Sequence, residues 1–148
     1  MSAIRSRNTK PEMLVRQLLH KDGFRYRLHA RDVPGRPDLL LPKFRAAVFV
    51  HGCFWHGHDC AAFKVPASRP DFWLHKISGN INRDMAVKSQ LNDLCWRVAT
   101  VWECALRGPS RLQPDELLCK LRTWLSSDSE RLDLRGSNEE FRAGIVRL

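Results

Sequence analysis

The chain has 148 residues, which is long enough for one domain with a substantial hydrophobic core. Its 25 lysine and arginine residues outnumber 16 aspartate and glutamate residues, and the net charge of +9 favours a polyanion such as nucleic acid as partner, although an inert basic surface carries the same charge. No long uncharged apolar run is present, which excludes a membrane span, and the N-terminus lacks an apolar signal segment, so we expect a cytoplasmic protein.

A first helix is predicted over Lys10–Asp22. Thr9 can cap its N-terminus, Pro11 lies in its first turn and Gly23 is a suitable terminator. Three short strands are predicted to follow it: Phe24–Leu28, Asp38–Leu41 and Arg45–His51.

The second half of the chain alternates between helical and strand patterns. A helical pattern covers Asp71–Leu94, with a break or kink expected near Gly79, and a buried strand is predicted at Trp96–Trp102. A loop at Glu103–Ser110 then leads to a last helix at Pro114–Leu125. The order favours an α/β fold in which a mixed sheet is flanked by helices. We expect residues 1–126 to form a single domain and residues 127–148 to form a loosely ordered tail.

Cysteine and histidine are concentrated in one short stretch. Cys53, His58 and Cys60 lie within eight residues, and Cys104 follows a predicted strand much later. Thiolates with one imidazole are the ligands of structural zinc sites, so these four residues predict such a site, although small core cysteines would give the same composition. The other two cysteines, at 95 and 119, are interpreted as bystanders.

A second group of polar residues suggests a divalent cation. Asp38 opens a short apolar strand, and a carboxylate at a strand end is suited to Mg²⁺, with Glu12 on the first helix available to hold a water molecule. Capping of the loop is the simpler alternative for Asp38. His51 and His56 flank the zinc ligands and are suited to proton transfer, with Asp84 available to orient one of them. Lone histidines are more often structural.

Aromatic residues accompany these groups. Phe54 and Trp55 are adjacent, and Phe72 and Trp73 repeat the pair at the start of the next helix. Large apolar side chains can wedge between base pairs of a duplex, whereas core packing is the usual fate of tryptophan.

Five segments closely resemble the very short patch repair endonucleases, and the resemblance covers roughly residues 2–125. The segments are PGRPD (Pro34–Asp38), FVHGCFWHGHDC (Phe49–Cys60), FWLHKI (Phe72–Ile77), NINRD (Asn80–Asp84) and WRVATVWECALRG (Trp96–Gly108). The resemblance implies a restriction-endonuclease-like fold and a Mg²⁺-dependent DNA mismatch endonuclease. Such an enzyme nicks double-stranded DNA 5′ of the thymine in T:G mismatches that arise from deaminated 5-methylcytosine.

The resemblance also implies roles for individual residues. It assigns Mg²⁺ to Asp38 and the Val50 backbone carbonyl, the general base to His56, and the orientation of that base to Asp84. His51 and Glu12 would position water molecules of the cation. The implied zinc ligands are Cys53, His58, Cys60 and Cys104, and the implied DNA-intercalating residues are Phe54, Trp55 and Trp73.

The chain departs from the family pattern in three places. Val50 stands where relatives can carry threonine, which should not matter for a backbone ligand. Cys95 occupies a helix-ending position that is often glycine, so we expect backbone strain there. The chain also begins almost at the first helix, whereas relatives carry a longer N-terminal arm that helps clasp DNA.

Two alternatives remain at this point. One is a DNA-nicking nuclease of another specificity, and the other is a non-catalytic, zinc-stabilised DNA-binding module. For the protein itself we expect a monomer that is associated with the nucleoid and that has mismatch-repair proteins as possible partners.

Overall fold

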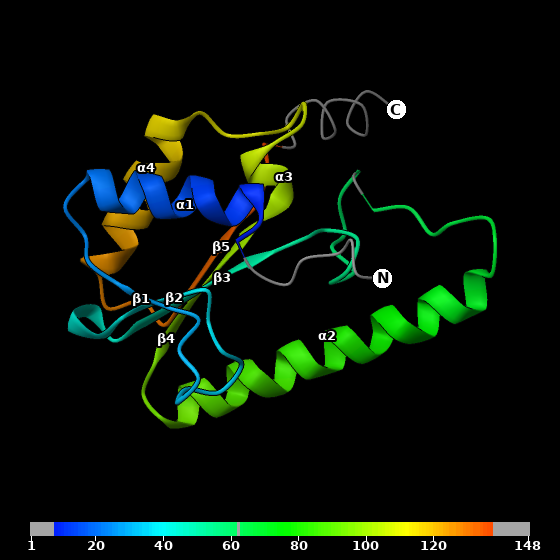
Figure 1. Ribbon diagram of the computed structural model, residues 1–148, viewed down its shortest axis with the longest axis horizontal. Helices are drawn as coiled ribbons and strands as arrows, with labels where there is room; N and C mark the ends of the chain where they lie inside the picture. The colour runs from blue at the N-terminus through cyan, green and yellow to red at the C-terminus, as the bar shows by residue number, and fades with distance from the viewer. Residues whose placement is uncertain (1–7, 62, 138–148) are drawn as a thin grey trace.

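A five-stranded mixed sheet forms the centre of the computed structural model, which describes residues 8–61 and 63–137 (Figure 1). The strands lie side by side in chain order, β1 to β5. The pairs β1–β2 and β2–β3 are antiparallel, whereas β3–β4 and β4–β5 are parallel. The strands are β1 (Arg27–Leu28), β2 (Leu39–Leu41), β3 (Ala46–His51), β4 (Arg97–Trp102) and β5 (Arg131–Leu134).

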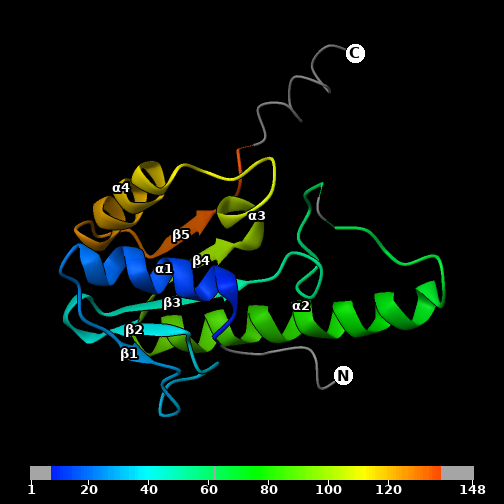
Figure 2. The same ribbon diagram turned by 45° about the horizontal axis from the view of Figure 1, so that its top comes forward.

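Helices cover both faces of this sheet (Figures 1 and 2). Helices α1, α3 and α4 lie on one face and the long helix α2 lies on the other. Their bounds are α1 (Lys10–Lys21), α2 (Pro70–Asp93), α3 (Glu103–Leu106) and α4 (Pro114–Leu125), and a short 3-10 helix, η1 (Pro42–Phe44), joins β2 to β3. The predicted α/β class is confirmed, and the arrangement is consistent with a restriction-endonuclease-like fold.

The alternation of side chains along the strands explains the two layers. Leu39 and Leu41 of β2 belong to the core cluster that contains Val15 of α1, whereas Leu40 belongs to the cluster that contains Leu91 of α2. All five side chains are fully buried. Because β2 and β3 are covered on both faces, their sequences read as continuous apolar runs rather than as alternating patterns.

Helix α1 begins as the sequence predicts. The Thr9 hydroxyl accepts a hydrogen bond of 3.3 Å from the backbone N–H of Glu12, and Pro11 lies in the first turn. Val15 and Leu19 face the sheet and are buried. This cap fixes the start of α1 and therefore the position of Glu12 in its first turn.

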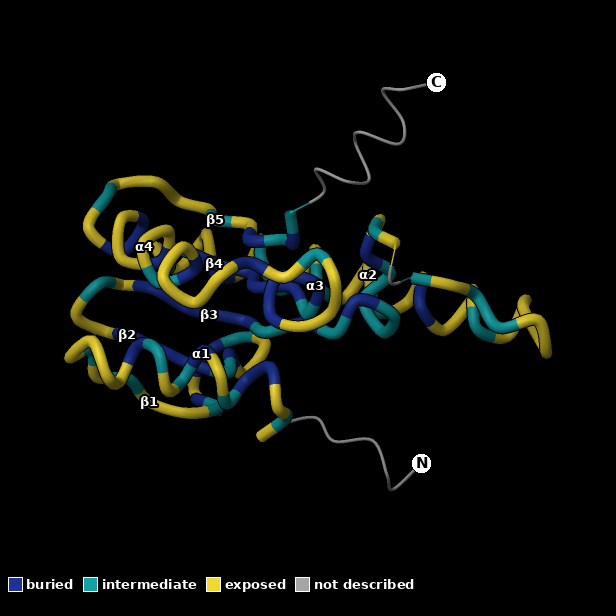
Figure 3. The backbone as a smooth tube through the Cα atoms, turned by 90° about the horizontal axis from the view of Figure 1, so that it is seen from above, coloured by how far each residue is buried: buried dark blue, intermediate teal, exposed yellow. Residues whose placement is uncertain are grey.

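Helix α2 does not break at Gly79, so that prediction is wrong. The helix runs without interruption for 24 residues, and a single glycine costs a helix only about 1 kcal/mol. Its N-terminal half extends beyond the sheet and is largely exposed (Figure 3). The helix is followed by Cys95, whose φ of 66° is in the left-handed region, as expected for a position that favours glycine.

Two further segments differ from the prediction. Glu103–Leu106 forms one helical turn, α3, where a loop was expected. Arg131–Leu134, assigned to a loose tail after residue 126, forms β5 and pairs in parallel with β4. Leu134 of this strand is buried in the core, which compensates for the charged residues Arg131 and Asp133 of the strand. Residues 138–148 of the predicted tail lie outside the described residues. Among the helices of the described part of the chain, none has the length and apolarity that a membrane span requires.

Candidate active site and metal centre

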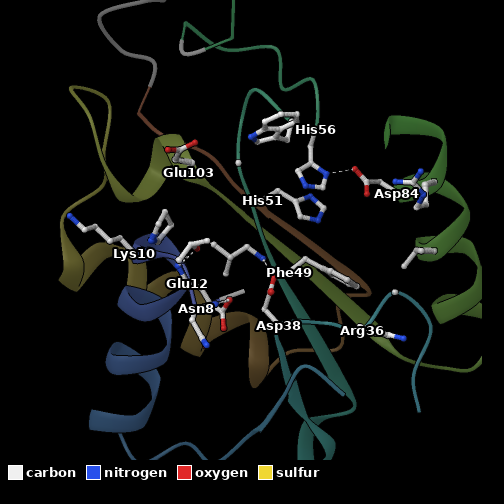
Figure 4. A pocket seen from close by; sticks show the side chains of 18 of the residues that line it. Asn8, Lys10, Glu12, Arg36, Asp38, Phe49, His51, His56, Asp84 and Glu103 are labelled. Carbon is white, nitrogen blue, oxygen red and sulfur yellow. Dashed lines mark hydrogen bonds and ion pairs between the residues drawn. The ribbon is translucent and has the colours of Figure 1, made fainter. Parts of the chain in front are cut away.

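One large cavity lies between the first turn of α1, the C-terminal end of β3 and the middle of α2 (Figure 4). Its volume is about 890 Å³. The residues predicted for catalysis and for Mg²⁺ all line it, although they come from five separate segments: Glu12, Asp38, Val50, His51, His56 and Asp84. The fold therefore brings together residues that the sequence only suggested as a group.

Asp38 lies directly before β2, and its side chain forms a hydrogen bond with β3. Its Oδ2 accepts a hydrogen bond of 2.7 Å from the Val50 backbone N–H. Burial raises the pKa of Asp38 to about 7; the Val50 hydrogen bond acts in the opposite direction, and the nearby carboxylate of Glu12 raises the pKa further. Two neighbouring carboxylates in a partly buried site are an oxygen donor set that fits Mg²⁺.

Glu12 is almost completely buried, with an exposed fraction of 1%. Its Oε1 accepts a hydrogen bond of 2.9 Å from the Asn8 backbone N–H, and its Oε2 lies 3.5 Å from the Arg16 guanidinium and 2.8 Å from His29 Nε2. A buried carboxylate requires such partners. Glu12, His29 and Asp38 form what we call the acidic cluster, because their ligand atoms lie within 4.8 Å of one another.

His51, His56 and Asp84 form a second group, which we call the histidine cluster. The two imidazole rings stack with centroids 3.7 Å apart and planes inclined by 2°. His56 Nδ1 lies 2.6 Å from Asp84 Oδ2 on α2. The predicted pairing of Asp84 with one of the histidines is therefore present, and its partner is His56.

The environment of His51 keeps its ring neutral. Burial lowers the pKa of His51 to about 3, and the neighbouring His56 lowers it further, while Asp84 acts in the opposite direction. Its Nδ1 is buried and, within the described residues, has no hydrogen-bond partner. A neutral imidazole can accept a hydrogen bond through one ring nitrogen and donate one through the other.

The loop after β3 reaches α2 because Gly57 lacks a side chain. Gly57 has a φ of 60°, and a Cβ at this position would approach Ile81 to 2.6 Å and Ile77 to 2.8 Å. The Asn80 amide also donates a hydrogen bond of 2.8 Å to the Trp55 carbonyl. These contacts place His56 opposite Asp84.

The four predicted zinc ligands come together in the structure. Ligand atoms of Cys53, His58, Cys60 and Cys104 all lie within 4.8 Å of one another, and we call this group the thiol cluster. Cys104 Sγ lies 3.7 Å from His58 Nδ1, close to the separation of about 3.5 Å between two ligands on tetrahedral zinc. The donor set thus fits zinc. The two other cysteines, at 95 and 119, are exposed and lie outside the cluster.

The thiol cluster joins three segments of the chain. Three of its members belong to the loop after β3, and Cys104 belongs to α3. The Gly136 backbone N–H, beyond β5, donates to Cys104 Sγ at 3.2 Å. Hydrogen bonds from Cys53, and then from His58 and Gly136, lower the pKa of Cys104 and favour the thiolate that binds metal. The His58 ring stacks on Trp102 of β4, with centroids 3.9 Å apart.

Phe54, Trp55 and Trp73 form an aromatic cluster beside the cavity. The ring centroid of Phe54 lies 5.0 Å from that of Trp55 and 5.6 Å from that of Trp73, and the ring centroids of the two tryptophans are 5.7 Å apart. All three residues are only partly buried, and Trp55 lines the cavity itself. Phe72, on the same turn of α2 as Trp73, is exposed. This cluster is separate from the core clusters of the sheet, which argues against plain core packing.

Some residues of the site were not foreseen from the sequence. His29 contacts Glu12, although nothing in its loop segment distinguishes it from a surface histidine. Basic side chains also line the cavity, where the sequence indicated only an overall positive charge: Lys10, Arg36, Arg83, Lys88 and Arg107. Their position suits contacts with DNA phosphates.

Comparisons with known proteins agree with this arrangement. A family model described as DNA mismatch endonuclease Vsr matches residues 1–62. The DNA mismatch endonuclease Vsr of Escherichia coli is 44% identical over 138 residues, which is 92% of this chain and 88% of that protein. The chain belongs to the Vsr family of DNA mismatch endonucleases. The resemblance inferred from the sequence motifs is thereby confirmed.

Two further relatives of this Vsr-family chain are named as nicking enzymes. The type II nicking enzyme V.XorIIP of Xanthomonas oryzae is 51% identical over 113 residues, covering 76% of this chain and 83% of that protein. The type II nicking enzyme V.NmeAIP of Neisseria meningitidis is 46% identical over 108 residues, covering 73% and 77%.

Proposed function

We propose that this Vsr-family endonuclease nicks double-stranded DNA 5′ of the thymine in T:G mismatches left by deamination of 5-methylcytosine, and that it requires Mg²⁺. The observation that carries the proposal is that Glu12 and Asp38 of the acidic cluster line the same cavity as the histidine cluster. The basic side chains of the same cavity can bind phosphates, and the aromatic cluster beside it can contact bases.

The Asp38 carboxylate and the Val50 backbone carbonyl would hold the cation. When bound, Mg²⁺ supplies charge neutralisation at the scissile phosphate and stabilises the leaving oxygen. Glu12 and His51 would position water molecules within the cavity, Glu12 through a carboxylate that Asn8 and His29 already hold in place. The raised pKa of Asp38, about 7, is the response of its carboxyl to burial when no cation is present.

His56 would take the proton from the attacking water. With Nδ1–H donated to Asp84, the Nε2 nitrogen of the neutral ring carries the lone pair that accepts this proton. The proton makes His56 positive, and the Asp84 carboxylate compensates that charge. Because His51 stays neutral, the stacked ring adds no second positive charge against it.

The remaining clusters would support recognition. Phe54, Trp55 and Trp73 would enter the duplex at the mismatch, where stacking is already weakened. The thiol cluster would bind zinc and brace the loop that carries His56, Phe54 and Trp55. In this assignment zinc takes no part in the chemistry.

A nicking enzyme with another target is the second candidate, because several relatives are named type II nicking enzymes. A non-catalytic DNA-binding module would explain the thiol and aromatic clusters, but it does not explain why Asp38 and His56 line the same cavity. Possible mismatch-repair partners, a monomeric state and association with the nucleoid remain part of the proposal.

A panel of duplexes tests the proposal. Matched, T:G and other mismatched duplexes are incubated with the protein, with and without Mg²⁺, and the cut strand and position are read on a gel. We expect nicking of the T:G duplex alone, 5′ of the thymine and only with Mg²⁺. Equal nicking of all duplexes would support the second candidate, and the absence of nicking would contradict both.

Asp38→Ala should abolish this activity. Asp32→Ala is a matched control, since Asp32 is an exposed residue whose ion pair with Arg27 lies at the surface. Undiminished nicking by Asp38→Ala would remove Asp38 from the mechanism. Elemental analysis of the pure protein should find one zinc per chain, and less than about half an equivalent would contradict the assignment of the thiol cluster.

A further inference from the structure

His29 occupies a position in the acidic cluster that the proposed chemistry does not use. It lies just after β1, and its φ of 49° is in the left-handed region that residues other than glycine rarely adopt. Its side chain is 17% exposed, which is low for a loop histidine. A rarely adopted backbone conformation persists where the surrounding contacts determine it.

Two hydrogen bonds hold His29 in this conformation. Its backbone N–H donates to the Asp38 carbonyl at 3.1 Å, and its ring Nε2 lies 2.8 Å from Glu12 Oε2. The first bond ties the residue to the chain directly before β2. The second requires the tautomer with a proton on Nε2 and ties the ring to the buried carboxylate on α1.

Apart from Asp38 itself, the other partners of Glu12 belong to α1 or to the residue before its cap. Asn8 and Arg16 both contact the carboxylate, but they hold it relative to the helix. His29 is on the sheet side of the cluster, so its bond holds the same carboxylate relative to Asp38. The positions of the two carboxylates are thus related through one side chain and one backbone amide.

This relation matters because two neighbouring carboxylates repel each other. Without a donor between α1 and the sheet, the Glu12 carboxylate would turn away from a charged Asp38 when no cation is present. A cation would then have to order the pair at the moment of binding, which lowers its affinity. A bond that orders the pair beforehand removes part of that cost.

We propose that His29 is a positioning residue for the divalent-cation site, which it pre-organises by holding the Glu12 carboxylate at a fixed place relative to Asp38. This inference rests on the proposed function, in which Asp38 holds Mg²⁺. Outer partners of metal ligands change cation affinity by about 10- to 100-fold when they are removed. His29 is therefore expected to set the Mg²⁺ concentration that the protein needs, with a smaller effect on the rate at saturating Mg²⁺.

Two substitutions separate the side-chain bond from the backbone conformation. Asparagine tolerates the left-handed region but is too short to reach Glu12, so His29→Asn removes the bond and keeps the backbone. Glutamine can place an amide N–H where Nε2–H lies in histidine, so His29→Gln restores the donor. His20→Asn, an exposed histidine on α1, is the matched control.

Two quantities are measured. Titration calorimetry with Mg²⁺ and Mn²⁺ gives the cation affinity of the zinc-loaded protein without DNA. Nicking of the T:G duplex at increasing Mg²⁺ gives the Mg²⁺ concentration at half-maximal rate, the half-saturation. His29→Asn should weaken cation binding and raise the half-saturation by about tenfold or more, whereas His29→Gln and His20→Asn should stay within about threefold of the parent. In a Glu12→Gln background, His29→Asn should have no further effect on cation affinity.

Unchanged cation affinity in His29→Asn would overturn the inference, including the case in which only the melting temperature falls. An equal loss in His29→Gln and His29→Asn would overturn it as well, because the donor would then not matter. If Asp38→Ala still binds the cation as the parent does, the proposed cation site itself is wrong, and this outcome is distinct from a failure of the His29 inference.

Discussion

The two halves of the candidate active site are held in place by different means. Asp38 and Val50 are bonded across adjacent strands whose neighbouring residues, Leu39 and Val48, are fully buried. His56 and the aromatic residues beside it lie on a loop without regular secondary structure, and most of this loop is only partly buried. The sheet half therefore depends on the hydrophobic core, whereas the loop half does not.

The loop half depends on a few specific contacts instead. The thiol cluster attaches it to α3, and Gly57 packs against α2 where no side chain would fit. A segment that lies outside the core clusters of the sheet can be ordered by metal ligands. We therefore expect that the proposed catalytic base and the aromatic residues Phe54 and Trp55 can be displaced while the sheet, and with it the proposed Asp38 site, remains folded.

Apart from the removal of Asp38 or His56 themselves, loss of the thiol cluster should have the largest effect. Cys104→Ser removes one of the four proposed zinc ligands and should reduce nicking by at least about 100-fold, because the loop that carries His56 loses its brace. Hydrogen exchange should show loss of protection in residues 52–60 while β3 and β4 stay protected. Cys119→Ser, at an exposed cysteine on α4, should behave as the parent. Global unfolding of Cys104→Ser would contradict the distinction between the two halves.

Asp38→Asn should stabilise the protein in the absence of Mg²⁺, although it removes the proposed cation ligand. The folded-state pKa of about 7 lies above the ordinary value of 3.8, so the carboxyl contributes its full stability below about pH 4 and loses it as the pH rises through 7. Asparagine stays neutral and can still accept from Val50.

The variant should thus be more stable than the parent at about pH 8, by at most about 4 kcal/mol, and the gain should shrink towards about pH 4. Denaturant unfolding of the zinc-loaded proteins, without added Mg²⁺, measures this difference. A variant that is less stable than the parent at the higher pH would show that burial of the carboxylate is not costly.

Asp84→Asn tests the loop half from the side of α2. The amide cannot compensate the positive charge on His56, so we expect the single-turnover rate to fall by about 10- to 100-fold with unchanged zinc content and DNA affinity. Asp93→Asn, at the exposed end of the same helix, is the control. A parental rate in Asp84→Asn would mean that the 2.6 Å contact has no role in proton transfer.

The smallest effect is expected for Trp55→Ala. Removal of the indole should lower the preference for T:G over matched DNA by about tenfold, since stacking on one base contributes about 1–3 kcal/mol. The rate on a bound T:G duplex should change less than the preference does. Binding and nicking of both duplexes give the two quantities separately, and an unchanged preference would place Trp55 in a purely structural role.

Much of the fold could be predicted from the sequence, because apolar runs such as Ala46–His51 and the leucines of α4 have one plausible place in a mixed sheet. The strand β5 was missed because its two leucines stand among charged residues, and only pairing with β4 buries Leu134. The sequence does not predict that α2 continues through Gly79, because the low helix propensity of glycine favours a break there, whereas the whole helix tolerates this cost.

The site shows the same division. Cys53, His58 and Cys60 are close in sequence, so their grouping could be predicted, and the motifs supplied Asp38 and Asp84 through the family resemblance. The contact between His29 and Glu12 could not be predicted, because it depends on a left-handed backbone and on the way α1 packs against the sheet. Interactions of this kind leave no periodic signal in a sequence.

The central claim is that the Asp38 side and the His56 side of the cavity act on the same phosphate. Single-turnover nicking of a T:G duplex by the parent, Asp38→Ala and His56→Ala tests it most directly, with DNA binding measured on the same proteins. We expect both variants to bind the duplex and neither to cut it at an appreciable rate. Parental nicking by either variant would contradict it.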